Sequence, residues 1–201
     1  PAEIGVAKSI VFDGSNSINL DGDATSPGNS KYYGTSGSGV KGFHDMNTDT
    51  PWTTITKASD ETVTNSATLQ DDDELQFSVT AGTYLIELLI KYSGNDVTKD
   101  FEWNFTCSAG TMQGFQQNKG LNASNAIQVL DEALVAASTN ASDRIWGVLA
   151  SDAHRPGYIM LFVTFTNDCT FKFRWAESAT GAATTVTVHS GSILRYKNLG
   201  A

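Results

Sequence analysis

The sequence predicts an all-β protein: an antiparallel β-sandwich or jelly roll over residues 61–201, preceded by an extended N-terminal arm over residues 1–60. Apolar and polar residues alternate in short runs, as at 101–106 and 169–176, and a period of two puts one set of side chains on a buried face and the other in water. Ser, Thr, Asn and Gly are abundant and only 17% of residues are charged, which is typical of strands and tight turns.

The first 60 residues differ from the rest. Short strands are expected at 8–12 and 17–20, each running into an Asp-Gly turn and together forming one short hairpin. Residues 24–42 are rich in Gly and Ser, and ordering them costs about 1–2 kcal/mol per residue with little apolar burial to offset it. We therefore expect this segment either to lie against its own domain or to be ordered by a neighbour.

Beyond residue 60, strands are expected at the spacing of a sandwich or jelly roll. Their expected ranges are 61–69, 74–79, 83–92, 100–106, 111–116, 126–137, 144–150, 157–167, 169–176, 183–189 and 192–197. The acidic run 71–74 is expected to be a turn. In 83–92, Leu85 and Leu89 are apolar on the face opposite Ile86 and Leu88, which predicts a central strand or one covered on both sides. Residues 126–137 fit a helical stripe as well as a strand, and we favour a strand or a covering loop.

The charge distribution limits the partners that we expect. Net charge is −9, with 7 Lys and Arg against 19 Asp and Glu in residues 1–143 and 6 against 3 in residues 144–201. An acidic chain repels phosphate, so no nucleic acid is expected. The polarity suits docking on an oppositely charged protein surface, or a solvated acidic face. No targeting peptide is visible and the longest apolar run, 158–163, is too short to span a bilayer, so no membrane association is expected.

Cysteine and acidic clusters give little sign of a cofactor or metal. Cys107 and Cys169 both fall in expected strands without zinc-ligand spacing, and free buried thiols are favoured over a bridge. The Asp-rich clusters lack the glycine and terminal Glu of a twelve-residue calcium loop. Incidental surface calcium at Asp21 and Asp23, or at 71–73, stays open as an alternative.

Catalytic patterns are weak. Residues 37–42 match a dinucleotide-binding glycine pattern, but the polar run before Pro51 forbids the helix that this site requires. His44, His154 and His189 are far apart in sequence and are expected at the surface or core edge. Two strand-borne carboxylates, Glu87 and Glu102, are expected to face solvent or to form ion pairs rather than to act as a glycosidase pair. The sequence therefore predicts no enzyme and no cofactor.

Two of the four tryptophans are expected in the core and two at a contact. Trp103 and Trp175 alternate with polar residues, as buried positions do. Trp52 and Trp146 are less constrained, and they are candidates for contact with a glycan or a neighbouring subunit.

Three segments resemble the β-sandwich domains of tailed-bacteriophage virion proteins. Residues 62–84 are similar to the opening of such domains, and residues 171–176 and 185–197 are similar to their end. The resemblance covers about 60–200 and implies a structural protein without catalytic residues, found in fibres, collars or capsid-decorating proteins. A compact domain with a pliable arm implies a capsid decoration protein on the capsid surface of the virion, assembled in the host cytoplasm and binding the major capsid protein or another virion protein.

We expect such a protein to be a homotrimer that uses its arm and its basic last strand for contact. The expected interface residues are Tyr32, Tyr33, Phe43, Trp52, Arg195 and Lys197. The alternative is a head- or tail-fibre module that binds a host receptor or carbohydrate, with Trp146 as a stacking surface.

Overall fold

A computed structural model gives the structure of the chain, which divides into two units, Pro1–Pro51 and Trp52–Ala201. It describes residues 10–12, 18–20, 31–35, 39, 41–45, 51–122, 124, 126–139, 144–149 and 153–200. Asp21, Asp23 and three of the six positions of the glycine pattern at 37–42 lie outside these residues.

The N-terminal unit contains two small antiparallel pairs. Strands β1 (Ile10–Phe12) and β2 (Ile18–Leu20) form the first pair, within the two strands expected from the sequence. The second pair, β3 (Lys31–Thr35) with β4 (Lys41–Asp45), falls in the Gly- and Ser-rich segment where no strand was expected. Cross-strand aromatic pairs described below stabilise this second hairpin.

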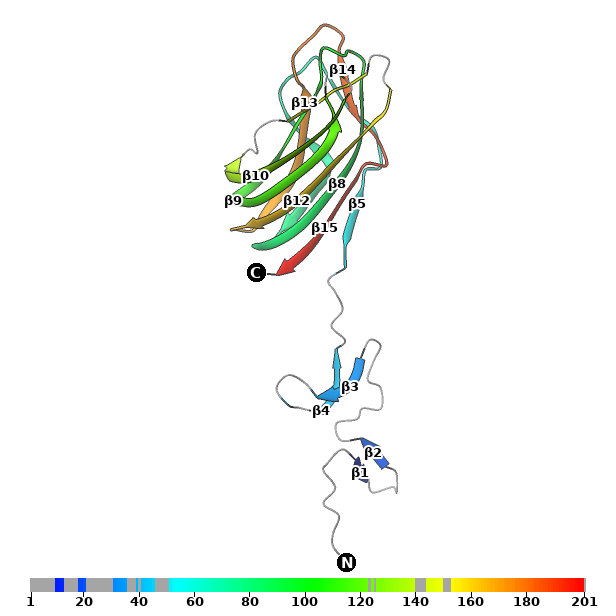
Figure 1. Cartoon of the computed structure of the whole chain (residues 1–201), viewed down its shortest axis with the longest axis vertical. Helices are drawn as coiled ribbons and strands as arrows, with labels where there is room; N and C mark the ends of the chain where they lie inside the picture. Colours follow the sequence, from blue (N-terminus) through cyan, green and yellow to red (C-terminus); the bar gives the residue numbers. More distant parts are fainter. Residues whose placement is uncertain are drawn as a thin grey trace, which may run out of the picture. The chain divides into compact units, whose positions relative to one another are not determined.

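The larger unit is built on one eleven-stranded antiparallel sheet (Figure 1). Its strands are β5 (Thr53–Thr56), β6 (Glu61–Thr64), β7 (Gln70–Val79), β8 (Gly82–Gly94), β9 (Phe101–Leu121), β10 (Ile127–Thr139), β11 (Arg144–Trp146), β12 (Arg155–Phe165), β13 (Cys169–Glu177), β14 (Thr185–Val188) and β15 (Ile193–Gly200). The described part of the chain contains no helix, and hence none that could cross a membrane.

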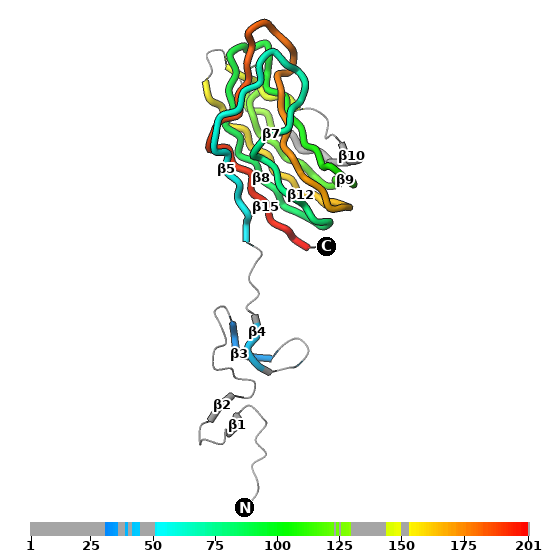
Figure 2. The backbone as a smooth tube through the Cα atoms, turned by 180° about the vertical axis from the view of Figure 1, so that it is seen from behind, coloured from blue at the N-terminus to red at the C-terminus, as the bar shows by residue number. Residues whose placement is uncertain are grey.

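The sheet folds over on itself because its longest strands run through both layers. The second half of β9 pairs with β12 on one edge and β10 on the other, and its first half pairs with β13 and β11. One layer therefore has the order β5-β15-β8-β12-β9-β10, seen from its outer side in Figure 1. The opposite layer contains β7, β13, the start of β9 and β11; Figure 2 brings β7 to the front. This nearly closed sheet confirms the expected all-β antiparallel fold.

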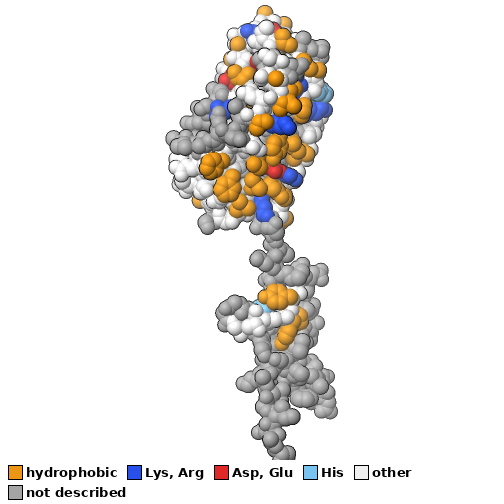
Figure 3. Space-filling view, in the orientation of Figure 1, with side chains coloured by type: hydrophobic (Ala, Val, Ile, Leu, Met, Phe, Trp, Pro, Cys, Tyr) orange, Lys and Arg blue, Asp and Glu red, His pale blue; other side chains and the backbone are white. Residues whose placement is uncertain are grey.

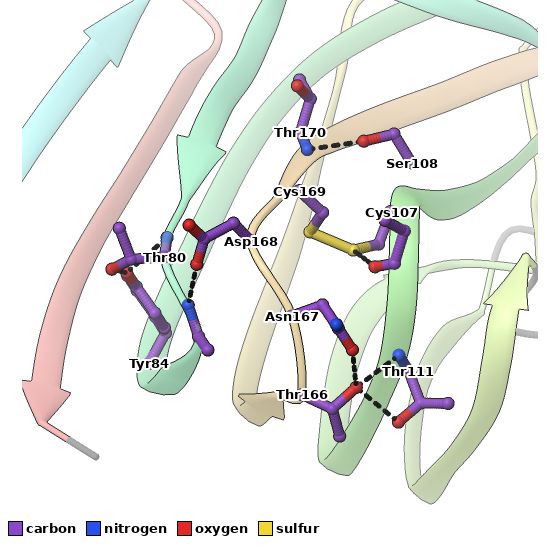
Figure 4. The surroundings of a disulfide bond; sticks show 12 residues. Thr80, Tyr84, Cys107, Ser108, Thr111, Thr166, Asn167, Asp168, Cys169 and Thr170 are labelled. Carbon is purple, nitrogen blue, oxygen red and sulfur yellow. Dashed lines mark hydrogen bonds between the residues drawn. A yellow bond between two sulfur atoms is a disulfide. The ribbon is translucent and has the colours of Figure 1, made fainter.

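A disulfide bond marks the bend of β9 (Figure 4). Cys107 is bonded to Cys169 across β9 and β13, with a Cα–Cα distance of 5.7 Å. Beside it, the Thr111 amide donates to Thr166 Oγ1 at 2.9 Å, and Gly110 takes a φ of +76° that favours glycine. The expectation of free thiols is therefore wrong: the cysteines are 62 positions apart in sequence, and the antiparallel pairing of β9 with β13 brings them together.

Aromatic side chains fill the space between the layers. Trp103 and Trp175 are fully buried, as expected, and Phe101 stacks on Trp175 with ring centroids 5.8 Å apart. The interior also includes Phe105, Phe165, Phe171 and Phe173 from three strands and Ile86, Leu88 and Ile90 from β8. Burial of each such side chain contributes about 1.5–3 kcal/mol, so this core holds the two layers together.

The acidic run 71–74 is part of strand β7 and not a turn. Asp72 points into the protein, where it is 0% exposed and lies 3.0 Å from the ammonium group of Lys57, itself 1% exposed. The Trp175 indole N–H also donates to Asp72, at 3.1 Å. A carboxylate can occupy a strand interior here because a buried lysine supplies the opposite charge.

Three other expected strand ranges can be compared with the observed strands. The expected strands 100–106 and 111–116 are the two halves of the single strand β9, whereas 126–137 is a strand, β10, as favoured. Residues 53–56, grouped with the arm from the sequence, form β5 and pair with β15.

Candidate interaction surface

The expected contact residues of the N-terminal unit lie on one hairpin. Tyr33 on β3 faces Phe43 on β4 in an edge-to-face arrangement with ring centroids 5.3 Å apart. Tyr32 lies 5.7 Å from the His44 ring and is 45% exposed. The two cross-strand pairs give the hairpin a local aromatic core and leave Tyr32 accessible for contact.

Trp52 and Arg195 come together on the larger unit, as two of the expected interface residues. The Arg195 guanidinium lies 4.6 Å from the centroid of the Trp52 ring, and it also forms an ion pair with Glu87. The Tyr158 hydroxyl donates to Glu87 at 3.1 Å. Burial, together with the negative charge of Glu87, raises the pKa of Tyr158. The expectation that Glu87 is an ion-paired strand residue is confirmed.

The outward side chains of β15, β8, β12, β9 and β10 form a surface that we call the outer face. One row across it contains Leu85, Phe162 and Phe115, which the strand register places side by side. Phe115 is 67% exposed and Phe162 is 47% exposed. Figure 3 shows hydrophobic side chains gathered on this side of the molecule, with basic side chains between them.

A second row of the outer face is also largely apolar. It runs through Ile193, Leu89, Tyr158, Lys119 and Val129. A shallow groove of about 280 Å³ lies along the middle of this row and is lined by residues of four strands: Leu89, Leu121, Ile127, Pro156, Gly157 and Tyr158 with Lys119 and Gly120. Lys197 projects from the same side, opposite Leu85. The sequence hinted at this surface only through Leu85 and Leu89.

Trp146 is not available as a stacking surface. It is 1% exposed, and its indole N–H donates to Asn118 at 3.4 Å. Gly120 and Gly157 leave the space that the indole ring occupies, since a Cβ at those positions would lie 2.5 Å and 2.0 Å from it. The expectation of contact at Trp146 is therefore wrong, and the overlooked signal was one glycine in each of two neighbouring strands.

The described acidic residues do not form a metal site. Asp71 forms ion pairs with Lys172 at 2.7 Å and Arg174 at 3.1 Å, and Asp72 is paired with Lys57. Among the residues that the structure describes, no group of three or more His, Cys, Asp or Glu side chains is placed to hold an ion.

One hydrogen-bond chain resembles a catalytic arrangement that the sequence did not predict. Asp60 Oδ2 lies 2.9 Å from His189 Nδ1, and His189 Nε2 lies 2.9 Å from Ser93 Oγ. The Ser190 amide and His189 lower the pKa of Asp60 to about 2. A serine nucleophile must reach its substrate, and Ser93 is only 1% exposed. These hydrogen bonds therefore have a structural role, in which they connect β8 to the turn before β15. His154, exposed as expected, lies beside His189 with the two rings tilted by 41° and their centroids 4.0 Å apart.

Comparisons with known proteins add little to this geometry. No protein-family model matches the chain, and no curated protein matches it. A structure of infectious bursal disease virus Gt strain is similar over 78% of this chain and 41% of that chain, at 12% identity and a TM-score of 0.20. The crystal structure of the infectious bursal disease virus VP2 subviral particle covers 81% and 40%, at 9% identity and a TM-score of 0.18. The chain spans about two-fifths of the length of these viral proteins, and a likeness this low carries no argument about its function.

Proposed function

We propose that this chain is a non-enzymatic structural protein of a bacteriophage virion: a capsid decoration protein that binds the major capsid protein and stabilises the shell. The observation that carries the proposal is the pairing of a rigid β body with a separate unit, Pro1–Pro51, whose hairpin presents exposed Tyr32 beside Tyr33 and Phe43. The resemblance of residues 60–200 to virion β-sandwich domains supports the same function.

In this proposal the N-terminal unit attaches to the shell and the β body lies outside it. Tyr32, Tyr33 and Phe43 supply aromatic contact area, a composition favoured in protein interfaces. A standard interface buries about 800 Å² on each partner, which a unit of this length is able to supply. Trp52, Arg195 and Lys197 are proposed contacts to a neighbouring protein on the body itself.

Decoration is favoured over carbohydrate binding because of where the tryptophans lie. Trp146, the residue on which a sugar would have stacked, is buried, and Trp52 is covered on one face by Arg195. The most exposed aromatic ring of the described residues, Phe115, has no polar group with which to orient a sugar.

The test compares the full chain with residues 52–201 for binding to phage shells that lack the protein. Ending the deletion at Pro51 keeps β5 and its ladder with β15 intact. We expect the full chain to sediment with shells and to appear on the head in particle images, and residues 52–201 to stay folded by circular dichroism but to remain in solution. A matched pair, Tyr32→Ala against Val97→Ala, compares two side chains that are each 45% exposed. Shell binding by residues 52–201, or labelling confined to the tail, would contradict the proposal.

A further inference from the structure

The outer face is large enough to form a protein contact, and its two apolar rows are separated by a row that contains Arg195, Glu87 and Gln117. It spans five strands at about 4.8 Å spacing and about nine residues at about 3.3 Å each, or roughly 700 Å². Stable protein interfaces bury about 800 Å² per partner. The outer face thus has the area that a stable protein contact requires.

The strand pattern points the same way. Leu89 is 48% exposed and Phe162 is 47% exposed, yet both lie in the middle of the layer. Strands that are apolar on both faces are typical of sheets covered on both sides. The inner side of this layer is covered by the core, so its outer side is the one that calls for a partner.

Charge identifies the partner. The outer face carries four cationic side chains, Lys91, Lys119, Arg195 and Lys197, and the carboxylate of Glu87, and the register also places Asp131 of β10 on this side. The rest of residues 52–201 carries six Lys and Arg against fourteen Asp and Glu. The outer face is therefore the cationic side of an anionic body, and the body of a second copy offers the opposite charge.

We propose that a second copy of this chain docks on the outer face head to tail, with its acidic surface against the cationic and apolar face of the first. A symmetric face-to-face contact would bring the cationic side chains of both copies together, whereas a head-to-tail contact does not. Head-to-tail contacts build a closed ring or an open filament. The contact involves the β body alone and goes beyond the proposed attachment to a shell, so loss of shell binding on removal of Pro1–Pro51 leaves it intact.

The experiment measures self-association of the full chain by sedimentation velocity. We expect the wild type to form oligomers at about 10 µM, and Phe115→Ser with Phe162→Ser to raise the dissociation constant at least tenfold. Ile145→Ser is the matched control, because Ile145 is 48% exposed, close to the 47% of Phe162, but lies on β11 in the other layer. Near-UV circular dichroism checks that every variant keeps the native core.

Charge reversal distinguishes the two docking modes. Lys119→Glu is expected to weaken a head-to-tail contact several-fold and to strengthen a face-to-face contact. A monomeric wild type at about 100 µM, an equal loss with Ile145→Ser, or tighter association with Lys119→Glu would each overturn the proposal. So would a monomer that binds vesicles of anionic phospholipid through Phe115 and Phe162, because the occupant would then be a membrane.

Discussion

Replacing Lys57 with Met is expected to lower the free energy of unfolding by about 3 kcal/mol, at the lower end of the 3–5 kcal/mol measured when one partner of a buried ion pair is removed. The Lys57 ammonium is 1% exposed and lies 2.8 Å from Glu61 and 3.0 Å from Asp72. Without it, Asp72 stays buried as a charge with no cation beside it.

The hydrogen bonds that Asp72 keeps set the magnitude. It still accepts the Leu75 amide at 2.8 Å and the Trp175 indole N–H at 3.1 Å. These donors compensate part of the lost charge, which places the expected cost near 3 rather than 5 kcal/mol. Lys172→Met is the control, because its partner Asp71 is 42% exposed and such surface pairs contribute about 0–1 kcal/mol.

The cost is expected to depend on pH. Burial raises the pKa of Glu61 and Lys57 opposes that shift, so the Met variant raises it further. A carboxyl group whose pKa is higher in the folded than in the unfolded chain destabilises the fold above the unfolded pKa of about 4.3, and this cost falls as the pH falls. Burial lowers the pKa of Lys57, but hydrogen bonds to Glu61 and Asp72 raise it above its ordinary value, so the wild-type contribution is lost only at strongly alkaline pH.

Urea unfolding at pH 7 and pH 5 measures both effects. The deficit of Lys57→Met should be smaller at pH 5, whereas the Lys172→Met deficit should be small at both. A Lys57→Met cost below about 1 kcal/mol that is equal at the two pH values would refute the reasoning, since it would mean that Asp72 does not depend on this cation.

Three further changes test the packing of the body. Reduction of Cys107–Cys169 should lower the unfolding free energy by about 4 kcal/mol, from the 62-residue separation that it closes, as measured by urea unfolding with and without a thiol reductant. Gly157→Ala should cost about 3 kcal/mol and shift the near-UV spectrum, because the new methyl group would lie 2.0 Å from Trp146. Gln116→Leu should raise the free energy of unfolding by about 1–2 kcal/mol, seen as a higher thermal midpoint, because both amide atoms of this side chain, 1% exposed, are without a hydrogen-bond partner.

Each of these has a clear opposite result. An unfolding curve unchanged by the reductant would mean that the two thiols are not bonded. An unchanged stability and near-UV spectrum in Gly157→Ala would mean that the Trp146 ring does not lie against Gly157. A loss of stability in Gln116→Leu would show that the amide is hydrogen-bonded.

Alternation of side chains predicts most of the β body because each strand has one covered face. Residues 101–106 and 169–176 have this pattern, and both lie in strands. The pattern fails at 71–74, where the acidic run resembles a turn until Lys57, from a distant segment, is placed against Asp72. It also splits β9 in two, since it cannot show that a strand bends at Gly110 and continues.

The candidate surface was predicted only in part, for a related reason. Sequence reasoning weighs exposed aromatics one at a time, so it named Trp146, which two glycines on other strands allow to be buried. Phe115 and Phe162 form a shared apolar surface only because the register of β9 and β12 places them side by side. Likewise Asp60, His189 and Ser93 are 129 and 96 positions apart and meet only in the fold.

The bend of the long strands also determines how the body responds to mechanical load. Strand β9 is hydrogen-bonded along both edges and runs from one layer into the other. The two layers therefore cannot separate without breaking the hydrogen bonds of β9 to its neighbouring strands. Pulling on the N-terminal unit is transmitted through Trp52 and β5 to β15 and then to β8, strand by strand. The body is therefore a stiff anchor rather than a hinge.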